Sequence, residues 1–453
     1  MTKQQRLVLV VSILASVVSA IDGFIVNVAL PAISHGLGGG LAVQQWTVDA
    51  YLLTLSALIL IAGSLSDLFG RKRILQIGLL WFGIASLLCA IAPNGPVLVL
   101  SRALQGVGGA LLVPSSLALI ISAFSGPPQG RAIGIWTAWF SIATIAGPLL
   151  GGVILGLGPW RWIFAVNVVP IALTLWLLAR LHLPEHVRSG TNVDVRGAVL
   201  CAFGLGAPVF GLIEQPTYGW GSVRVWWPLV FGTAALVVFV WHEARTRRPM
   251  LPLSLFRVRN FTYGNLATLA IYAGLSVSSF LITITLQQVG GYSPLQASLA
   301  TIPVSIMMFF LSSRFGALAG RFGPRLFMTF GPIVAAGGFL LMLRVQPHVN
   351  YPADLLPGVL LFGLGLSMTV APLTSAVLGD VGKEHAGVAS AVNNAVARAA
   401  GLVSIALVGV ITGPHLGIAG FHRTLIVVAV LLVIGGVVSF IGIRRPAAAQ
   451  ATH

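Results

Sequence analysis

Long apolar stretches separated by short loops recur from one end of this 453-residue chain to the other. A helix that crosses a lipid bilayer needs about 20 predominantly apolar residues, and these stretches reach that length. Only 8% of the residues are charged, whereas a soluble domain carries about 25% because its surface faces water. The chain is therefore predicted to be an all-α integral membrane protein without a sizeable soluble domain.

The apolar stretches predict fourteen membrane-spanning helices. Two cations precede the first stretch and Val18-Ser19-Ala20 resembles a signal-peptidase site, so a cleaved signal peptide is the alternative for this segment. We interpret it as the first span, because its apolar character continues to Leu30. The expected bounds are 7–30, 45–66, 74–93, 97–123, 131–155, 161–182, 195–214, 224–242, 260–288, 295–319, 325–345, 354–379, 385–412 and 421–443.

The basic residues are distributed unevenly between the loops. A net charge of +16 would indicate nucleic acid in a soluble protein, but here the cations lie in short loops between spans. Cytoplasmic loops of membrane proteins are enriched in Lys and Arg. With the N-terminus inside, 19 of the 26 Lys and Arg residues fall on the inner side, 4 on the outer side and 3 within spans. We therefore expect an inner-membrane protein with both termini in the cytoplasm and no nucleic-acid partner.

A Gly-rich basic segment occurs twice in the chain. Residues 63–73 (GSLSDLFGRKR) follow the second predicted helix, and residues 316–325 (GALAGRFGPR) follow the tenth. The repeat predicts two six-helix halves, 1–190 and 251–453, joined by a central two-helix insertion at 191–250. Paired halves around a site near the membrane midplane are typical of secondary transporters. The expected architecture is therefore 6 + 2 + 6.

Three charged residues are predicted to lie within the membrane in the N-terminal half. From the helical rise and the bilayer thickness, Asp22 and Arg102 each lie about 8 Å below the outer face, and Asp49 lies close to that layer. Intramembrane charge is expensive, so it normally pairs or lines a wet cavity. A purely structural ion pair needs one acid, not two. With one arginine for two carboxyl groups, one of them is poorly compensated and can take up a proton.

Six motifs follow one another in an order and spacing that resemble the major facilitator superfamily, and in particular its fourteen-span drug:proton antiporter branch. The resemblance covers essentially the whole chain and implies the major facilitator fold. One departure is the last outer loop, at about 413–420, which is shorter than in many members and puts substrate contacts from it in doubt. The motifs are IDGFIVNVALP at 21–31, QWTVDAY at 45–51, the segment 63–73, RALQGVG at 102–108, GPLLGG at 147–152 and GVASAVNNAVAR at 387–398.

Two of these motifs have a mechanical interpretation. Gly63 and Gly70 permit a tight turn, and Asp67 can accept hydrogen bonds from a helix N-terminus or from Arg71, which would latch the cytoplasmic helix ends together. The alternative is that the cations only set the topology. The resemblance implies that the antiporter motif consists of Gly147, Pro148, Gly151 and Gly152. They suit a helix that bends or seals the cavity, although a kink that serves packing alone is the alternative.

Polar residues near the middle of the halves are candidates for the substrate cavity. The fourth-helix motif adds an amide to this set, and the thirteenth helix supplies two amides and an arginine. Aromatic side chains such as Trp46 and Tyr51 either line this cavity or serve packing. The cavity candidates are Asn27, Gln105, Asn393, Asn394 and Arg398.

The function implied by the resemblance is proton-coupled antiport that exports lipophilic drugs by alternating access. We expect a monomer that needs no cofactor, with transport driven by the proton gradient. We expect Asp22 to be the essential proton carrier, Asp49 to be wetter and modulatory, and Arg102 to tune both. Export of one metabolite, such as an antibiotic, a siderophore or an amino acid, is the alternative, and a proton-coupled nutrient importer is disfavoured by the Gly-Pro motif.

Other classes of protein find no support in the sequence. The chain has neither a G-x-x-x-x-G-K-[ST] phosphate loop nor an H-E-x-x-H motif, which argues against an ATP-driven pump and an intramembrane enzyme. Cys89 and Cys201 lie in apolar stretches, so free thiols are expected, and no metal-ligand spacing is present.

The charge asymmetry predicts that the 214–224 loop lies outside the cell and the C-terminus inside. A reporter that is active only in the cytoplasm should be inactive when fused after position 218 and active at the C-terminus, because a different span count would scramble the asymmetry. Cytoplasmic activity at position 218 would show that the two central helices are misassigned.

Overall fold

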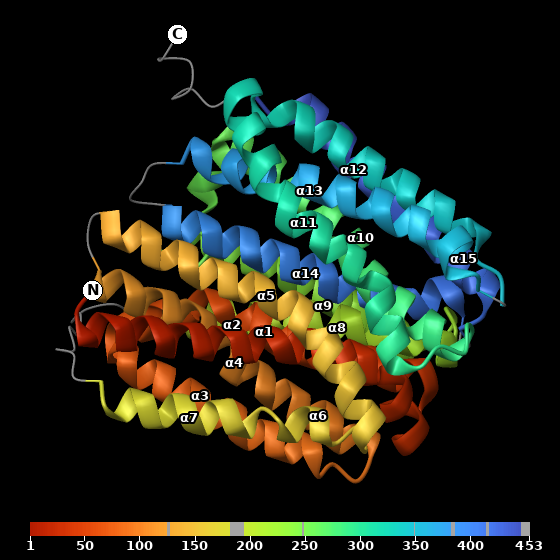
Figure 1. Cartoon of the computed structure of the whole chain (residues 1–453), viewed down its shortest axis with the longest axis horizontal. Coiled ribbons are helices and arrows are strands. Elements are labelled where there is room, and N and C mark those ends of the chain that lie inside the picture. The colour runs from red at the N-terminus through yellow and green to blue at the C-terminus, as the bar shows by residue number, and fades with distance from the viewer. Residues whose placement is uncertain are drawn as a thin grey trace.

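The computed structural model shows, in its described part, a bundle of helices that run alongside one another (Figure 1). It contains 14 spans long and apolar enough to cross a membrane, and each overlaps a predicted one, so the all-α fourteen-span fold is confirmed. Cys89 and Cys201 are buried free thiols, as expected. The described residues are 1–124, 127–181, 194–246, 249–347, 349–381, 386–413 and 416–444.

The N-terminal half, as we use the term below, consists of helices α1 to α7. The last two helices together form the sixth span, which a turn at 166–167 divides. The bounds are α1 (Lys3–Leu37), α2 (Gly40–Phe69), α3 (Arg71–Ala90), α4 (Gly95–Ala123), α5 (Pro127–Leu157), α6 (Trp162–Ala165) and α7 (Val168–Ala179).

A central pair, α8 (Val195–Tyr218) and α9 (Val223–Arg245), follows, and a short 3₁₀ helix η1 (Leu253–Arg257) leads into the C-terminal half. This half consists of helices α10 to α15, with a 3₁₀ turn η2 at the end of α12 and a π-helical turn η3 before α13. The bounds are α10 (Arg259–Gln288), α11 (Pro294–Phe322), α12 (Pro324–Leu341), η2 (Met342–Arg344), η3 (Tyr351–Leu355), α13 (Leu356–Gly379), α14 (Ala386–Thr412) and α15 (Ile418–Gly442).

Side chains at the helix starts explain why several helices begin where they do. Thr2 and Gln5 form a reciprocal capping box at the start of α1, in which each side chain bonds the other residue's backbone N–H. Ser293 and Gln296 do the same at the start of α11. The side chain of Asn94 caps α4. These contacts satisfy backbone donors that have no partner within the first turn of a helix.

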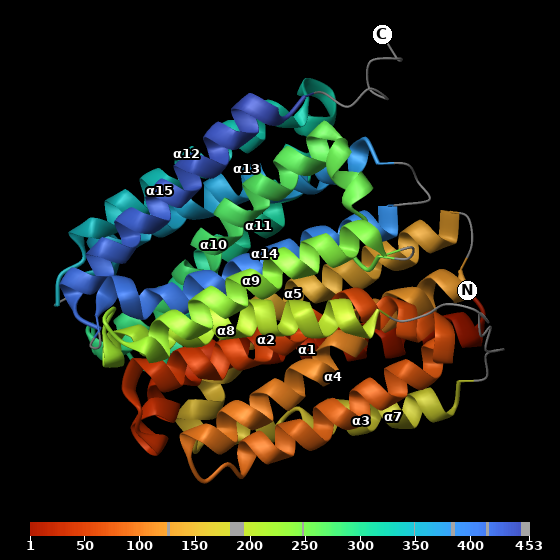
Figure 2. The same cartoon turned by 180° about the vertical axis from the view of Figure 1, so that it is seen from behind.

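The two halves repeat one arrangement of helices. In the N-terminal half, α4 packs against both α2 and α3, and α1 packs against α5. In the C-terminal half, α13 packs against both α11 and α12, and α10 packs against α14. We call the contact between the halves the seam; it joins α1, α2 and α5 to α10, α11 and α14. The central pair lies along it, with α8 against α2 and α14 (Figure 2).

The repeated Gly-rich segments are turns of matching conformation. Gly70 separates α2 from α3 with φ of 92°, and Gly323 separates α11 from α12 with φ of 89°. Two residues after Gly70, Lys72 Nζ donates to the Leu181 carbonyl at 2.8 Å, just beyond the sixth span. Two residues after Gly323, Arg325 Nε donates to the carbonyl of Phe440, near the end of α15, at 2.8 Å. In each half, a cation on the third helix therefore holds the end of the sixth.

The hydrogen bonds that join described residues across the seam gather toward one end of the bundle, where α1 ends and α2 begins. Gln45 Nε2, in the second turn of α2, donates to the carbonyls of Ile405 at 2.6 Å and Ala406 at 3.0 Å in α14. The remaining ones run from Gln287 Nε2 to the Val28 carbonyl at 2.9 Å, from Ser298 Oγ to the Pro148 carbonyl at 2.9 Å, and from Asn27 Nδ2 to Ser279 Oγ at 3.4 Å.

The glycine turn between α2 and α3 generates a stability prediction. Gly70→Ala should destabilise the protein by about 1–2 kcal/mol, because an L side chain at positive φ meets the neighbouring carbonyl. Gly63→Ala is the matched control, because Gly63 is helical and no heavy atom lies within 4 Å of an added Cβ. The thermal unfolding midpoint in detergent should fall for Gly70→Ala only. An equal fall in both would contradict this account of the turn.

Candidate functional site

The side chain of Asp22 lies at the centre of a buried charge network in the N-terminal half. Asp22, in α1, is 0% exposed, and its Oδ2 accepts a hydrogen bond from Arg102 Nη1 at 2.6 Å. Its Oδ1 accepts from Gln105 Nε2 at 2.9 Å and from Asn167 Nδ2 at 2.8 Å. Two helices, α1 and α4, and the α6–α7 turn therefore meet at one carboxylate. Charge-assisted hydrogen bonds of this kind are strong, so the network fixes these helices to one another.

Arg102 is held from several sides. Its Nη1 also donates to Gln105 Oε1 at 2.5 Å, and its Nε donates to the Thr47 carbonyl of α2 at 2.9 Å. The guanidinium carbon lies 4.3 Å from the centre of the Tyr51 ring, and the Tyr51 hydroxyl shares a hydrogen bond of 3.0 Å with Ser19. A planar guanidinium suits this combination of forked hydrogen bonding and aromatic stacking. The arginine therefore links α1, α2 and α4.

The sequence did not single out Asn167, although it completes the network. Asn167 is 2% exposed and lies in the turn that divides the sixth span into α6 and α7. An amide within the apolar stretch 161–182 was the available signal, because an intramembrane polar group needs a partner. Gln105, a cavity candidate in the sequence, is fully buried, and its Nε2 also donates to Ser86 at 2.9 Å. The structure thus places Gln105 in the network around Asp22.

Asp49 lies close to this layer in a different environment. It is the tenth residue of α2, not one near the start of that helix, and it is 0% exposed. The expectation that Asp49 is the wetter carboxyl is therefore wrong, because α2 begins five residues earlier than predicted. Neither carboxylate oxygen has a hydrogen-bond partner among the described residues. Arg102 consequently pairs with Asp22 alone.

The position of Asp49 along α2 indicates which helices it faces. Residues four apart lie on the same face of a helix. Gln45, one turn before Asp49, donates a hydrogen bond to α14. Leu53, one turn after Asp49, packs closely on α8, because a Cβ added to Gly206 would lie 2.9 Å from the Leu53 side chain. The Asp49 carboxyl therefore lies on the face of α2 that meets α14 and α8. This face belongs to the seam.

The Gly-Pro motif of α5 is also a seam element. A Cβ on Gly147 would lie 2.8 Å from the Phe24 Cβ of α1, and one on Gly151 would lie 3.0 Å from Ile25. On another side of α5, a Cβ on Gly152 would lie 2.7 Å from the Leu295 Cα of α11. The Pro148 carbonyl accepts from α11 as described above. Small residues permit such close helix approach in membranes, so this motif sets the contact of α5 with both halves.

The cavity candidates of the C-terminal half lie in α14. Asn393 Nδ2 donates to Thr268 Oγ1 at 2.9 Å and to the side chain of Asn265 at 3.1 Å, which ties α14 to α10. Asn394 is exposed, and its amide donates to a carbonyl of its own helix. The Nε of Arg398 is buried without a hydrogen-bond partner among the described residues. Arg398 therefore differs from Arg102, whose Nε and Nη1 both donate hydrogen bonds.

The predicted latch residues lie at the end of the bundle that holds the N-terminus. Because α2 continues to Phe69 and α3 begins at Arg71, the expected loop is reduced to a single residue, Gly70. Arg71 Nη1 donates to the Ala118 carbonyl of α4 at 3.2 Å. The side chain of Asp67 lies outside the part of the chain that the structure describes. The hydrogen bond of Arg71 therefore joins the start of α3 to α4.

The fold and the buried intramembrane charges together define a multi-pass membrane transporter. Residues 12–405 match the family model of the Major Facilitator Superfamily. The chain therefore belongs to this superfamily, as the sequence motifs predicted, and it is a transporter and not an enzyme. Its helices also superimpose on the crystal structure of a D-xylose–proton symporter with a TM-score of 0.70, covering 97% of this chain and 98% of that one at 16% identity. At that identity the likeness concerns the fold alone.

Two relatives are similar over most of their length. The chain is 34% identical to the multidrug resistance protein Stp of Mycobacterium tuberculosis over 410 residues, which cover 90% of this chain and 76% of Stp. It is 36% identical to the puromycin resistance protein pur8 of Streptomyces alboniger over 425 residues, which cover 92% of this chain and 84% of pur8. The homologues thus include resistance proteins.

The Asp22 network generates a second stability prediction. Arg102→Leu should destabilise the protein by about 3–5 kcal/mol, because it leaves the buried Asp22 carboxylate without its cation. Adding Asp22→Asn to that variant should restore part of the loss, because the uncompensated charge is gone. Arg314→Leu, at an exposed arginine of α11, is the control and should unfold near the wild-type midpoint. Thermal unfolding in detergent measures all three, and an unchanged midpoint for Arg102→Leu would contradict the structural role of the pair.

Proposed function

We propose that this protein is a proton-coupled antiporter that exports lipophilic drugs or toxic compounds across the cytoplasmic membrane. One line of support is that the Asp22 carboxylate is fully hydrogen-bonded, whereas the Asp49 carboxyl has no hydrogen-bond partner among the described residues. The other is that homologues are resistance proteins. The observation that carries the proposal is Asp49, which is fully buried, lacks a hydrogen-bond partner among the described residues and lies on a seam helix. An ionised carboxylate without a partner is costly to bury, and a bound proton removes that cost.

The structure favours Asp49 over Asp22 as the group that carries the proton. The Asp22 carboxylate accepts hydrogen bonds from three side chains, including Arg102, and must break its ion pair to take up a proton. Asp49 has no such pair to break. A rocking motion of the halves would change the surroundings of Asp49 most, because it faces the seam. We therefore assign Asp22 and Arg102 a positioning role and assign proton transfer to Asp49.

The distribution of seam hydrogen bonds supports an alternating-access cycle. If the N-terminus is cytoplasmic, the bonded end of the seam is the outer end, and the structure is the inward-facing state. Substrate would then enter from the cytoplasm or inner leaflet and meet Asn27, Asn394 and Arg398. Protons arriving from outside would reach Asp49 when the outer end opens, and the loaded carboxyl would favour return to the inward state. A ligand shifts such an equilibrium only by its differential affinity for the two states.

The range of substrates separates two versions of this proposal. Expression in a strain that lacks its own efflux pumps, followed by growth on puromycin, ethidium and a wider panel, should show resistance to several unrelated compounds. Resistance to one compound would instead indicate a specific exporter, the alternative that the sequence left open. Unchanged sensitivity throughout, with the protein present in the membrane, would contradict export of drugs.

Proton coupling has a sharper test in proteoliposomes. With an acidic lumen, wild-type protein should accumulate a compound identified in the resistance screen above its external concentration, and nigericin should abolish that accumulation. Asp49→Asn mimics the protonated form, so it should equilibrate the compound without accumulating it. Glu214→Gln is the matched control, because Glu214 also lies in a seam-lining helix, at hydrogen-bond distance from Trp46 Nε1, and should accumulate normally.

The outcome for Asp22→Asn distinguishes the two carboxyls. We expect slower transport with accumulation retained, because only the positioning of Arg102 is weakened. Loss of accumulation in Asp22→Asn with normal accumulation in Asp49→Asn would overturn our assignment and restore Asp22 as the carrier. Normal accumulation in both would place the coupling group elsewhere.

A further inference from the structure

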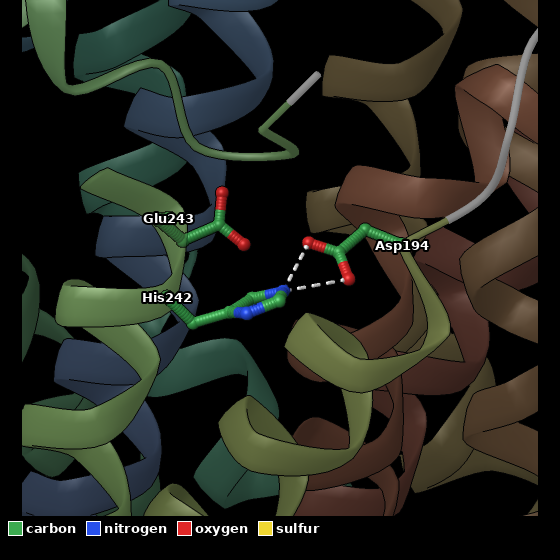
Figure 3. Close-up of side chains that lie close together, drawn as sticks. All are labelled: Asp194, His242 and Glu243. Carbon is green, nitrogen blue, oxygen red and sulfur yellow. Dashed lines mark hydrogen bonds and ion pairs between the residues drawn. The ribbon is translucent and has the colours of Figure 1, made fainter. Parts of the chain in front are cut away.

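A second cluster of ionisable side chains lies in the central pair, away from the Asp22 network. Asp194 caps the start of α8, and its Oδ1 accepts from the Gly197 backbone N–H at 2.9 Å. His242 and Glu243 lie in the last turn of α9. Figure 3 shows the three side chains converging from the two helix ends. The cluster thus joins the beginning of the central pair to its end.

The donor atoms of this cluster are close enough to share one ion. His242 Nε2 lies 3.0 Å from each carboxylate oxygen of Asp194. One ligand atom from each of Asp194, His242 and Glu243 lies within 4.8 Å of the others. Ligand atoms of a tetrahedral ion with bonds of about 2.0–2.2 Å lie about 3.3–3.6 Å apart. Side-chain rotations that close this gap would bring all three atoms within bonding distance of one ion.

Glu243 adds an independent sign that a cation or a proton belongs between these groups. Its side chain is 2% exposed, and Oε2 accepts from the Leu251 backbone N–H at 2.8 Å. The other oxygen, Oε1, is buried without a hydrogen-bond partner among the described residues. A buried carboxylate oxygen left in this way costs free energy unless a cation or a proton satisfies it. Its orientation toward Asp194 is visible in Figure 3.

The backbone beside the cluster leaves room for both carboxylates. A Cβ on Gly197 would lie 2.6 Å from Glu243 Oε1 and 2.7 Å from Asp194 Oδ2. Such distances are too short for non-bonded atoms, so only glycine fits here while both carboxylates keep their positions. The two acidic groups are thus held next to each other, although like charges repel. A divalent cation would compensate both at once.

We propose that Asp194, His242 and Glu243 form a binding site for a first-row divalent transition-metal ion, with Zn²⁺ as the best-fitting candidate. One imidazole and two carboxylates are a donor set that suits this class of ion, and three protein ligands leave a fourth position for water. His242 would exchange its hydrogen bond with Asp194 for a bond to the metal, and binding would release any proton held by the cluster.

The bound ion would act as a clip in the central pair. It would tie the start of α8 to the end of α9, and through Glu243 to the segment at Leu251 that leads toward the C-terminal half. Because α8 packs on α2 and α14, the clip would fix the central pair beside the seam. The sequence offered no metal-ligand spacing, since Asp194 precedes His242 by 48 residues. This inference does not depend on the transported substrate or on proton coupling.

Metal binding by the purified full-length protein tests the site directly. The protein, carrying an affinity tag without histidine, is stripped with EDTA, exchanged into metal-free detergent buffer and titrated with ZnCl₂ against a chromogenic chelator. We expect one tightly bound Zn²⁺ per chain, and a higher thermal unfolding midpoint with Zn²⁺ than with EDTA. Glu243→Gln and His242→Ala should weaken binding by about tenfold or more and remove the thermal shift. Wild-type protein without a bound ion, or variants that bind as tightly, would overturn the proposal.

Matched variants separate loss of a ligand from loss of the fold. Glu214→Gln and His422→Ala change the same residue types elsewhere, and both should bind Zn²⁺ as the wild type does. His242→Cys supplies a thiolate, another good zinc ligand, and should bind more tightly than His242→Ala. The midpoints in EDTA show whether each variant is folded. If a folded His242→Cys binds no better than His242→Ala, the residue at 242 is not a ligand and the site fails.

Discussion

The interior of a lipid bilayer contains no water to satisfy polar groups, and this constraint underlies the structure of the whole chain. Backbone groups can meet it only within helices, which is why the described regular structure is helical. Side chains that remain polar must find partners among themselves. In the N-terminal half they do so around Asp22, where one carboxylate and one guanidinium draw in Gln105, Asn167 and the Thr47 carbonyl. The buried ion pair and its hydrogen bonds thus join four membrane spans: α1, α2, α4 and the sixth span.

Several polar groups at the seam lack the partners that Asp22 has. Asn27 Oδ1, both oxygens of Asp49 and the Arg398 Nε are buried without hydrogen-bond partners among the described residues. Each lies on a helix that meets the opposite half. A saturated network resists rearrangement, whereas an unsatisfied group gains from any state that supplies a proton, a ligand or water. We therefore expect the Asp22 network to stay rigid and these three seam residues to respond to protonation or to a ligand.

Much of the fold was predictable from the sequence, because membrane spans are recognised by their length and hydropathy. The fourteen spans followed from apolar length, and the rarity of intramembrane charge singled out Asp22, Asp49 and Arg102 as one layer. Which carboxyl pairs with the arginine did not follow from the sequence. Helix ends were less predictable. Three glycines at 38–40 obscure the start of α2, which was placed at residue 45 although the helix begins at Gly40, and this error made Asp49 seem close to water. Asn167 escaped attention because a single amide hardly changes the hydropathy of its stretch.

The cluster in the central pair shows a different limit. Asp194 and Glu243 look like ordinary loop acids in the sequence, since nothing there indicates that the ends of α8 and α9 meet. Only the antiparallel return of the chain places them beside His242. Spacing rules detect sites built within one segment and miss those built by tertiary contact. Gly197 was equally inconspicuous, because glycine is common in membrane helices and its packing role emerges only from its neighbours.

The cation that holds the end of the sixth span in each half has a consequence for how variants of this protein should sort. The third helix and the sixth span of each half are hydrogen-bonded to each other. We therefore expect each half to move as one rigid unit. In the alternating-access cycle that we propose, a destabilising substitution inside one half affects the inward-facing and outward-facing forms equally, so it lowers the amount of folded protein and leaves the ratio of the two forms unchanged. Damage at the seam is felt by one form more than by the other, and it changes the ratio while the amount stays the same. On the proposed cycle, we therefore expect variants inside a half to change mainly the amount of folded protein, and variants at the seam to change mainly the balance between the two forms.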